Sequence, residues 1–450
     1  MMLSLLLACG APEPAAAPST PTVKPRPDIV VVLAPGLRAD VPGIPGAEAS
    51  FLTALGRTPD DRFSAAYSQS PTPFTAFGAL LTGMYVGAIP MCALPRGTGN
   101  LELLTDRPWC ASIPDARYTI PEVLALYGYH TSLVTSGFPA ADVFAKEFQT
   151  SKQVDSSAEL GPATLEAWGT EAPRFMVVIA SDLRFSARTD ATQVLDGLSG
   201  TTVPPRPSMD VIHRAQAAYA TAAGTFGGVI KGVLDGLEGA AGSQGLTAIV
   251  GGLTGLNLAE QGGSRDDFVP LLVEDFILDR TIHVPLFIFE PGGGETTLHN
   301  DPVELVDIFP TVTALAGVKP PADLPGADLR EAPTQLAAGT GYAELGDQLA
   351  LRQGTGFMLF RCYVHFCTSL DPQVTQRLVE SDVSQSGGPL AYWDLMRDPL
   401  QDELSSDTRR AYGVRETLLS LRQGAAAVPS DAIDAQKLWS IRMVRSQGYW

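Results

Sequence analysis

Short apolar runs alternate with helical patterns along the first two thirds of the chain. The first run, Asp28–Leu33, is rich in β-branched residues and is typical of a buried parallel strand. Residues 119–128 have Pro near their start and Gly at their end, which predicts a helix, and residues 131–135 predict a strand after it. Further strands are expected at 175–180, 246–250 and 284–289. Between the first two of these runs a long helix is expected, because apolar residues recur at spacings of three and four: Phe226, Val229, Ile230, Val233 and Leu237.

This alternation predicts an α/β fold with three layers, in which helices cover both faces of a mainly parallel, mixed sheet. The pattern changes near residue 340. Residues 341–345, 356–360 and 362–367 predict short alternating strands, and a helix is expected near 414–421. We therefore expect an α/β domain at 28–340 and a smaller C-terminal α+β subdomain with an antiparallel sheet at 341–450.

The N-terminus carries a short apolar run, and the segment after it has few side chains that could pack into a hydrophobic core. Residues 1–9 end in Leu-Leu-Ala-Cys, which resembles the lipobox of bacterial lipoproteins, although the run is shorter than an ordinary signal peptide and has no basic start. Residues 10–27 are mainly Pro, Ala, Ser and Thr and predict an extended tether. We expect a signal at 1–9, a lipid on Cys9, and a location in the bacterial cell envelope, either periplasmic or surface-exposed. The alternatives are a buried thiol and an untethered secreted form.

The composition and the net charge limit the classes of partner that the protein can bind. Of 450 residues, 45% are hydrophobic and 18% charged, as in globular proteins, and the formal charge is -18. This charge argues against nucleic acid and anionic membrane surfaces, because phosphate binding needs clustered Lys and Arg.

Four cysteines remain beside Cys9, an even number in what is predicted to be an oxidising compartment. Of three possible connectivities we favour two local disulfides, Cys92 with Cys110 and Cys362 with Cys367. A zinc site is the alternative, but no C-x-x-C pair is present and the histidines are scattered.

Several motifs together resemble one known family. Residues 37–40 read Leu-Arg-Ala-Asp after the first strand, and residues 79–85 read Ala-Leu-Leu-Thr-Gly-Met-Tyr. With the blocks at 128–131, 284–288, 305–311 and 392–395, they resemble the sulfatase family of the alkaline phosphatase superfamily from about residue 28 to 450. The resemblance implies that family's fold, a divalent metal bound at strand ends, and cleavage of sulfate or phosphate esters.

The positions that the resemblance assigns to chemistry carry unsuitable residues. At the nucleophile position stands Pro73, which cannot attack an ester. The supporting cations fall on Ser136, Phe138 and Arg184. The metal ligands fall on Pro35, Gly36, Leu253 and Thr254, of which only the last has a side-chain oxygen, whereas Ca²⁺ takes about six to eight oxygen ligands.

Other residues allow a rebuilt site. Thr72 and Thr75 flank Pro73 and are either displaced nucleophiles or helix caps, and a threonine nucleophile needs a nearby base or metal. His283 precedes a strand and is expected to be structural. Arg38 either pairs with Asp40 or another acid, or contacts an anionic ligand. A displaced metal could be held by an acidic cluster that we expect to be solvated: Asp266, Asp267, Glu274, Asp275 and Asp279.

The sequence therefore favours a lipid-anchored pseudoenzyme with no cofactor, which binds an unknown protein or glycan or acts as a scaffold. The alternative is an active sulfuric ester or phosphoester hydrolase with a rebuilt site and a Ca²⁺ or Mg²⁺ ion.

Overall fold

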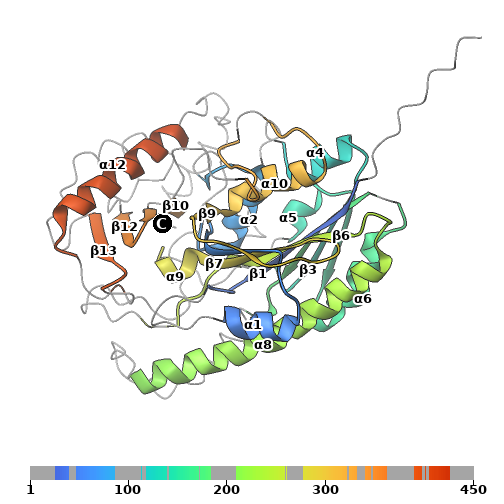
Figure 1. Cartoon of the computed structure of the whole chain (residues 1–450), viewed down its shortest axis with the longest axis horizontal. Coiled ribbons are helices and arrows are strands. Elements are labelled where there is room, and N and C mark those ends of the chain that lie inside the picture. Colours follow the sequence, from blue (N-terminus) through green and yellow to red (C-terminus); the bar gives the residue numbers. More distant parts are fainter. Residues whose placement is uncertain are drawn as a thin grey trace, which may run out of the picture.

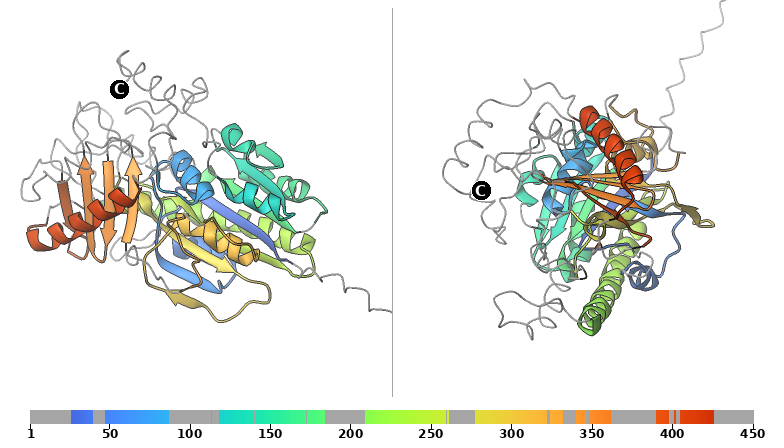
Figure 2. Two further views of the ribbon diagram at one scale, coloured as in Figure 1. Left: turned by 90° about the horizontal axis from the view of Figure 1, so that it is seen from above. Right: turned by 90° about the vertical axis from the view of Figure 1, so that its left-hand side faces the viewer.

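A nine-stranded mixed sheet forms the centre of the protein, and a four-stranded antiparallel sheet lies beside it (Figures 1 and 2). The structure is a computed structural model, and it describes residues 26–39, 47–86, 113, 118–138, 141–171, 173–183, 209–258, 260, 277–321, 324–331, 340–345, 348–361, 390–397, 401 and 405–425.

The large sheet is built around a central strand, β1 (Asp28–Pro35), which pairs in parallel with β5 (Arg174–Ala180) and β6 (Leu246–Thr254). Beyond β5 the order continues in parallel with β3 (His130–Ser136) and β4 (Thr150–Val154). On the other side, β7 (His283–Phe289) is antiparallel to β6, and β2 (Asp61–Tyr67) is antiparallel to β7. Two short strands, β8 (Thr297–His299) and β9 (Val303–Glu304), pair in parallel with β2. The expected mainly parallel, mixed sheet is confirmed.

Successive side chains of β1 enter opposite layers, as the two-residue period of a strand requires. Ile29, Val31 and Leu33 belong to one hydrophobic core, and Val30 and Val32 to the other. The first core is covered by α2 (Pro73–Thr82), α4 (Ile120–Leu126), α5 (Ala141–Ala145) and α10 (Ile308–Leu315). The second is covered by α1 (Glu48–Leu55), α6 (Leu160–Trp168) and α8 (Met209–Ala240). The predicted three layers are therefore present (Figure 1).

The small sheet follows the order β10 (Thr340–Leu345), β11 (Gln348–Gln353), β12 (Gly356–Arg361) and β13 (Leu390–Asp394), all antiparallel. One face packs on α12 (Thr408–Ala425), and the other packs on Tyr67, Ile277 and Ile282. This arrangement confirms the expected antiparallel C-terminal sheet.

Three short elements complete the description: the 3₁₀ turns η2 (Ser157–Glu159) and η3 (Leu305–Asp307), and α9 (Asp279–Ile282). Within the part of the chain that is described, no helix is both long enough and apolar enough to cross a membrane.

Candidate functional site

The carboxyl ends of the neighbouring central strands β1 and β6 lie side by side, where the sequence placed the metal ligands. We call this place, with residues 35–36 and 253–254, the β1–β6 edge. Pro35 is in register with Thr254, after an irregularity in the pairing. The Gly36 amide donates to the Thr254 carbonyl at 2.8 Å and more weakly to its hydroxyl at 3.4 Å. Gly36 takes a left-handed conformation (φ 88°), so the chain turns sharply there. The structure thus brings Pro35, Gly36 and Thr254 together, with Leu253 beside them and fully buried.

The backbones at this edge are in very close contact. A Cβ atom on Gly252 would lie 2.1 Å from the Leu37 carbonyl oxygen, and one on Gly255 would lie 2.0 Å from the Arg280 carbonyl oxygen. Among Pro35, Gly36, Leu253 and Thr254, the one side-chain oxygen is a hydroxyl, while a hard divalent cation needs several charged oxygens. These residues do not fit such an ion.

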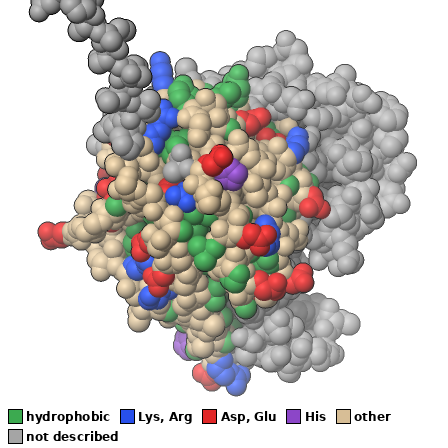
Figure 3. Space-filling model, turned by 90° about the vertical axis from the view of Figure 1, so that its right-hand side faces the viewer, with side chains coloured by type: hydrophobic (Ala, Val, Ile, Leu, Met, Phe, Trp, Pro, Cys, Tyr) green, Lys and Arg blue, Asp and Glu red, His purple; other side chains and the backbone are tan. Residues whose placement is uncertain are grey.

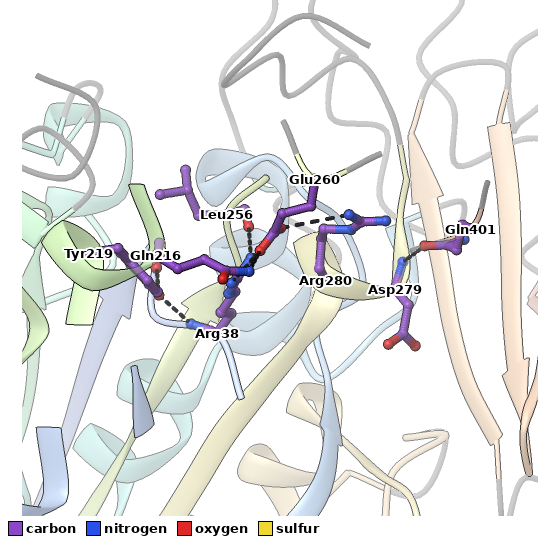
Figure 4. Close-up of polar contacts among 9 residues, drawn as sticks. Arg38, Gln216, Tyr219, Leu256, Glu260, Asp279, Arg280 and Gln401 are labelled. Atoms are coloured by element: carbon purple, nitrogen blue, oxygen red, sulfur yellow. Dashed lines mark hydrogen bonds and ion pairs between the residues drawn. The ribbon is translucent and has the colours of Figure 1, made fainter. Parts of the chain in front are cut away.

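Arg38 lies just beyond β1 and forms a buried ion pair with Glu260, which follows β6. Its two terminal nitrogens donate to the two carboxylate oxygens at 2.6 and 2.7 Å, and both side chains are almost fully buried (Figure 4). The Arg38 amide donates to the Tyr219 hydroxyl at 2.9 Å, and this hydroxyl donates to the Gly36 carbonyl at 2.5 Å. The expectation that Arg38 pairs with an acid is confirmed, and its partner is Glu260.

The charge of Glu260 is stabilised from three directions. Gln216 of α8 donates to Oε1 at 2.7 Å, and Nη1 of Arg280 lies 3.6 Å from Oε2 (Figure 4). Burial acts to raise the pKa of Glu260, but the charges of Arg38 and Arg280 and the hydrogen bonds outweigh it and lower the pKa to about 2. Glu260 is therefore an ionised structural anchor, and it is not placed to act as a general base.

Pro73 occupies the first turn of α2, where a missing amide proton has no cost. Thr72 takes the N-cap position, and its carbonyl accepts the Ala76 amide at 2.9 Å. Its hydroxyl makes no capping bond and has no hydrogen-bond partner among the described residues. Thr75 lies inside the helix and is buried. The capping expectation is thus right for the position of Thr72 and wrong for its side chain and for Thr75.

Aromatic side chains fill the space between α2 and the end of β3. Phe77 makes edge contacts with Phe138 and Phe144, with ring centroids 5.9 and 4.8 Å apart, and Phe74 lies 5.0 Å from Phe144. All four rings are buried in one core with Leu253. At the end of β3 the Ser136 hydroxyl donates to Asp182 at 3.0 Å. The two family positions Ser136 and Phe138 therefore have structural contacts here.

A polar cluster lies between β7 and the small sheet. His283 is buried, stacks on Tyr67 at 4.9 Å between centroids, and contacts the Ser64 carbonyl at 3.0 Å. Asp279 lies 3.0 Å from Arg352 and 3.7 Å from His283. Burial acts to raise the pKa of Asp279, but hydrogen bonding with His283 and the positive charges outweigh it and lower the pKa. The structural assignment of His283 is supported, whereas the expectation that Asp279 is solvated is wrong.

A buried carboxyl group joins the two sheets. Glu304 at the end of β9 accepts the Tyr85 hydroxyl at 2.6 Å and the Tyr342 amide of β10 at 2.5 Å. Its own amide donates to Asp307 at 2.8 Å. Burial, followed by the charge of Asp307, raises the pKa of Glu304 to about 8, and burial raises that of Asp307 to about 6. Glu304 is therefore mostly protonated at neutral pH.

Several predicted residues lie outside the described part of the chain: Cys9, Asp40, Cys92, Cys110, Arg184, Asp266, Asp267, Glu274, Asp275, Cys362 and Cys367. Among the described residues, no three His, Cys, Asp or Glu side chains are grouped so that they could hold a metal ion. Sequence reasoning missed Glu260, and the available signal was weak: it is the one acid in the stretch from Leu246 to Gly263.

The architecture is similar to that of solved sulfatases and phosphonate monoester hydrolases. A putative sulfatase from Bacteroides thetaiotaomicron has a TM-score of 0.64 at 13% identity, over 92% of this chain and 96% of that one. A 2-O GAG sulfatase has a TM-score of 0.62 at 13% identity, over 90% and 93%. A phosphonate monoester hydrolase from Silicibacter pomeroyi has a TM-score of 0.59 at 14% identity, over 90% and 96%.

No family model matches the sequence, and no curated protein matches it either. At these identities the likeness establishes the fold. The fold predicted from the motif resemblance is confirmed, and the activity has to be argued from the site.

Proposed function

We propose that the chain is a sulfatase-like pseudoenzyme of the bacterial envelope, which holds no catalytic metal, cleaves no ester and acts as a binding or scaffold protein. One observation carries the proposal. Where β1 and β6 meet, the side chains of Pro35, Gly36, Leu253 and Thr254 offer one hydroxyl and no carboxylate. Metal-assisted ester cleavage needs a cation to orient the nucleophile and balance developing charge, and these side chains supply no charged ligand for it.

The surroundings of that edge support the same proposal. The helix that would present a nucleophile begins with Pro73, and its phenylalanines pack into the core. Glu260, which follows β6, is ion-paired with Arg38 and Arg280. The charge of Glu260 is therefore already balanced by two arginines.

Attachment to a membrane is the second part of the proposal, and it rests on the Leu-Leu-Ala-Cys motif and the tether at 10–27. The lipid would be on Cys9. The disulfides Cys92–Cys110 and Cys362–Cys367 belong to the same proposal, since exported proteins meet an oxidising compartment. Mass spectrometry of the native chain would test both, because four free thiols and an unmodified Cys9 would contradict them.

Metal analysis and turnover assays test the loss of catalysis. We expect purified protein to hold no stoichiometric Ca²⁺, Mg²⁺, Mn²⁺ or Zn²⁺ after dialysis, and to leave aryl sulfates and aryl phosphates intact. A retained stoichiometric ion would overturn the proposal.

The alternative, an active hydrolase with a rebuilt site, has one observation in its favour: the buried Thr72 hydroxyl has no hydrogen-bond partner among the described residues. Thr72→Val tests it with little risk to folding, because valine has nearly the same shape. Turnover that is present in the wild type and lost in Thr72→Val, but kept in Thr53→Val on the exposed part of α1, would establish the hydrolase instead.

A further inference from the structure

We propose that a small apolar surface around α4 rests on the lipid–water interface of the membrane, and that it turns the β1–β6 edge away from the bilayer. We call it the α4 surface, and it consists of Tyr118, Leu126 and Tyr127. The proposal rests on the lipid anchor at Cys9 proposed above, and it adds an orientation and a second contact with the membrane.

The α4 surface is unusually apolar for an exposed part of this protein. Tyr118 is 62% exposed, Leu126 76% and Tyr127 45%, and they are three of the seven large hydrophobic side chains that are exposed among the described residues. The opposite side of α4 is already buried, with Ile120 and Leu124 in the core. The outward side chains therefore contribute little to folding, and a contact with another surface would explain them.

The chain leaves the fold at this same surface. The Arg26 guanidinium donates to the Tyr127 carbonyl at 2.5 Å and lies over the Tyr127 ring, 5.7 Å from its centroid. The Tyr129 hydroxyl donates to the Pro27 carbonyl at 3.1 Å. Residues 10–25 separate Arg26 from Cys9, and a fully extended tether of that length reaches at most about 60 Å. A lipid on Cys9 would keep the point at which the chain leaves the fold within that distance of the bilayer.

The chemistry of the surface fits a zwitterionic interface. Tyrosine rings are favoured at the headgroup level, because they are apolar with one polar end. Glu122 is exposed four residues before Leu126, and its carboxylate accepts the Thr119 amide at 2.8 Å at the start of the helix, whereas Arg26 lies at the end beside Tyr127. Figure 3 shows hydrophobic, basic and acidic side chains interspersed over this side of the molecule. The overall charge of -18 disfavours strongly anionic lipid.

The direction of β1 relates the position of the β1–β6 edge to that of the α4 surface. β1 begins at Asp28, next to the tether, and ends at Pro35, in the candidate site. Eight residues of strand span about 26 Å, at about 3.3 Å per residue. With the α4 surface on the bilayer, the β1–β6 edge faces the aqueous side, where a soluble partner could reach the neighbouring surface.

Vesicle flotation of the full chain with Cys9→Ser measures membrane binding by the α4 surface without the lipid anchor. We expect this chain to float with phosphatidylcholine vesicles, and the added pair Leu126→Asp and Tyr127→Ser to reduce the floating fraction several-fold. Met396→Asp is the matched control, since Met396 is 70% exposed and lies beside the small sheet, and it should change nothing. All three side chains are exposed, and circular dichroism would check the fold of each variant.

The proposal is overturned if the Cys9→Ser chain does not float, if the Leu126 and Tyr127 changes have no effect, or if binding needs anionic lipid and disappears in salt. It is also overturned if those changes dissociate a dimer in size-exclusion chromatography without altering flotation, since a second copy then covers the surface. Failure of the anchor is a separate result: labelled fatty acid would be absent from the native chain, whatever the flotation of Cys9→Ser shows.

Discussion

Glu304 joins the two sheets through a buried carboxyl group with a raised pKa, so removing its ability to ionise should change how stability depends on pH. The suitable change is Glu304→Gln. A protonated carboxyl has one acceptor oxygen and one hydroxyl, and an amide offers the same acceptor with a donor in place of the hydroxyl. In Glu304→Gln the side-chain oxygen can still accept the Tyr342 amide, and the NH2 group can donate to the Tyr85 hydroxyl, which reverses that bond, while the titration is lost.

The magnitude follows from the pKa of Glu304, which burial and then the charge of Asp307 raise from 4.5 to about 8. Between these two pH values the unfolded chain is ionised at this residue while the folded chain keeps its proton. The unfolded state then binds fewer protons, so the free energy of unfolding falls as pH rises. At about 1.4 kcal/mol per pH unit, the loss reaches about 5 kcal/mol at pH 8 and levels off above it.

Urea unfolding followed by far-ultraviolet circular dichroism, from pH 4.5 to 8.5, would measure the effect. We expect wild type and Glu304→Gln to be nearly equal at pH 4.5 and the variant to become increasingly more stable towards pH 8. Asp307, whose pKa is raised to about 6, gives both proteins a common loss at lower pH, so the difference between the curves is the quantity to read. The exposed Glu331→Gln serves as the control for removing one acid. Parallel curves for wild type and Glu304→Gln would refute the reasoning.

Three further changes test buried contacts after β6, at the start of α2 and within β6. Glu260→Gln should lower the free energy of unfolding by about 3–5 kcal/mol, because it leaves a buried Arg38 charge without its counterion, and the double variant with Arg38→Met should recover part of the loss in urea titrations. Thr72→Val should leave the free energy of unfolding unchanged or raise it, because the buried Thr72 hydroxyl has no hydrogen-bond partner among the described residues. A fall in that free energy of more than about 1 kcal/mol would show that the hydroxyl has a partner. Gly252→Ala should destabilise by about 3 kcal/mol through its clash with backbone, whereas Gly232→Ala, in open space on α8, should stabilise by about 0.5–1 kcal/mol. If calorimetry shows the same change in melting temperature for both alanine variants, the close backbone contact at Gly252 does not restrict side chains there.

In the large sheet, the sequence predicted the strands that are buried almost throughout: β1, β3, β5, β6 and β7. All of these except β3 contain a long apolar run, because helices cover both faces of the sheet. β4 reads Thr-Ser-Lys-Gln-Val at the edge of the sheet, and β2 is only half buried, so neither shows a distinctive pattern. Their places depend on pairing with strands distant in the chain.

The candidate site, like the fold, could be predicted only in part from the sequence. That residues 35–36 and 253–254 would meet could be predicted, because neighbouring parallel strands end at the same edge of a sheet. That Glu260 would be the partner of Arg38 could not, since the pair depends on how the chain after β6 packs on α8 and α9. The burial of Asp279 was missed for a similar reason: its partner Arg352 comes from the small sheet.

The glycines at the end of β6 have a consequence for anyone who would redesign this protein as a hydrolase. Gly252 and Gly255 allow three backbone segments to touch, with carbonyl oxygens standing where a Cβ would otherwise lie. Writing aspartates into positions 35, 36, 253 and 254 would add charge beside backbone segments that already pack tightly at Gly252 and Gly255. Such a design would have to move the loops apart before any change of side chain could matter, so the barrier to installing catalysis here lies in the main chain.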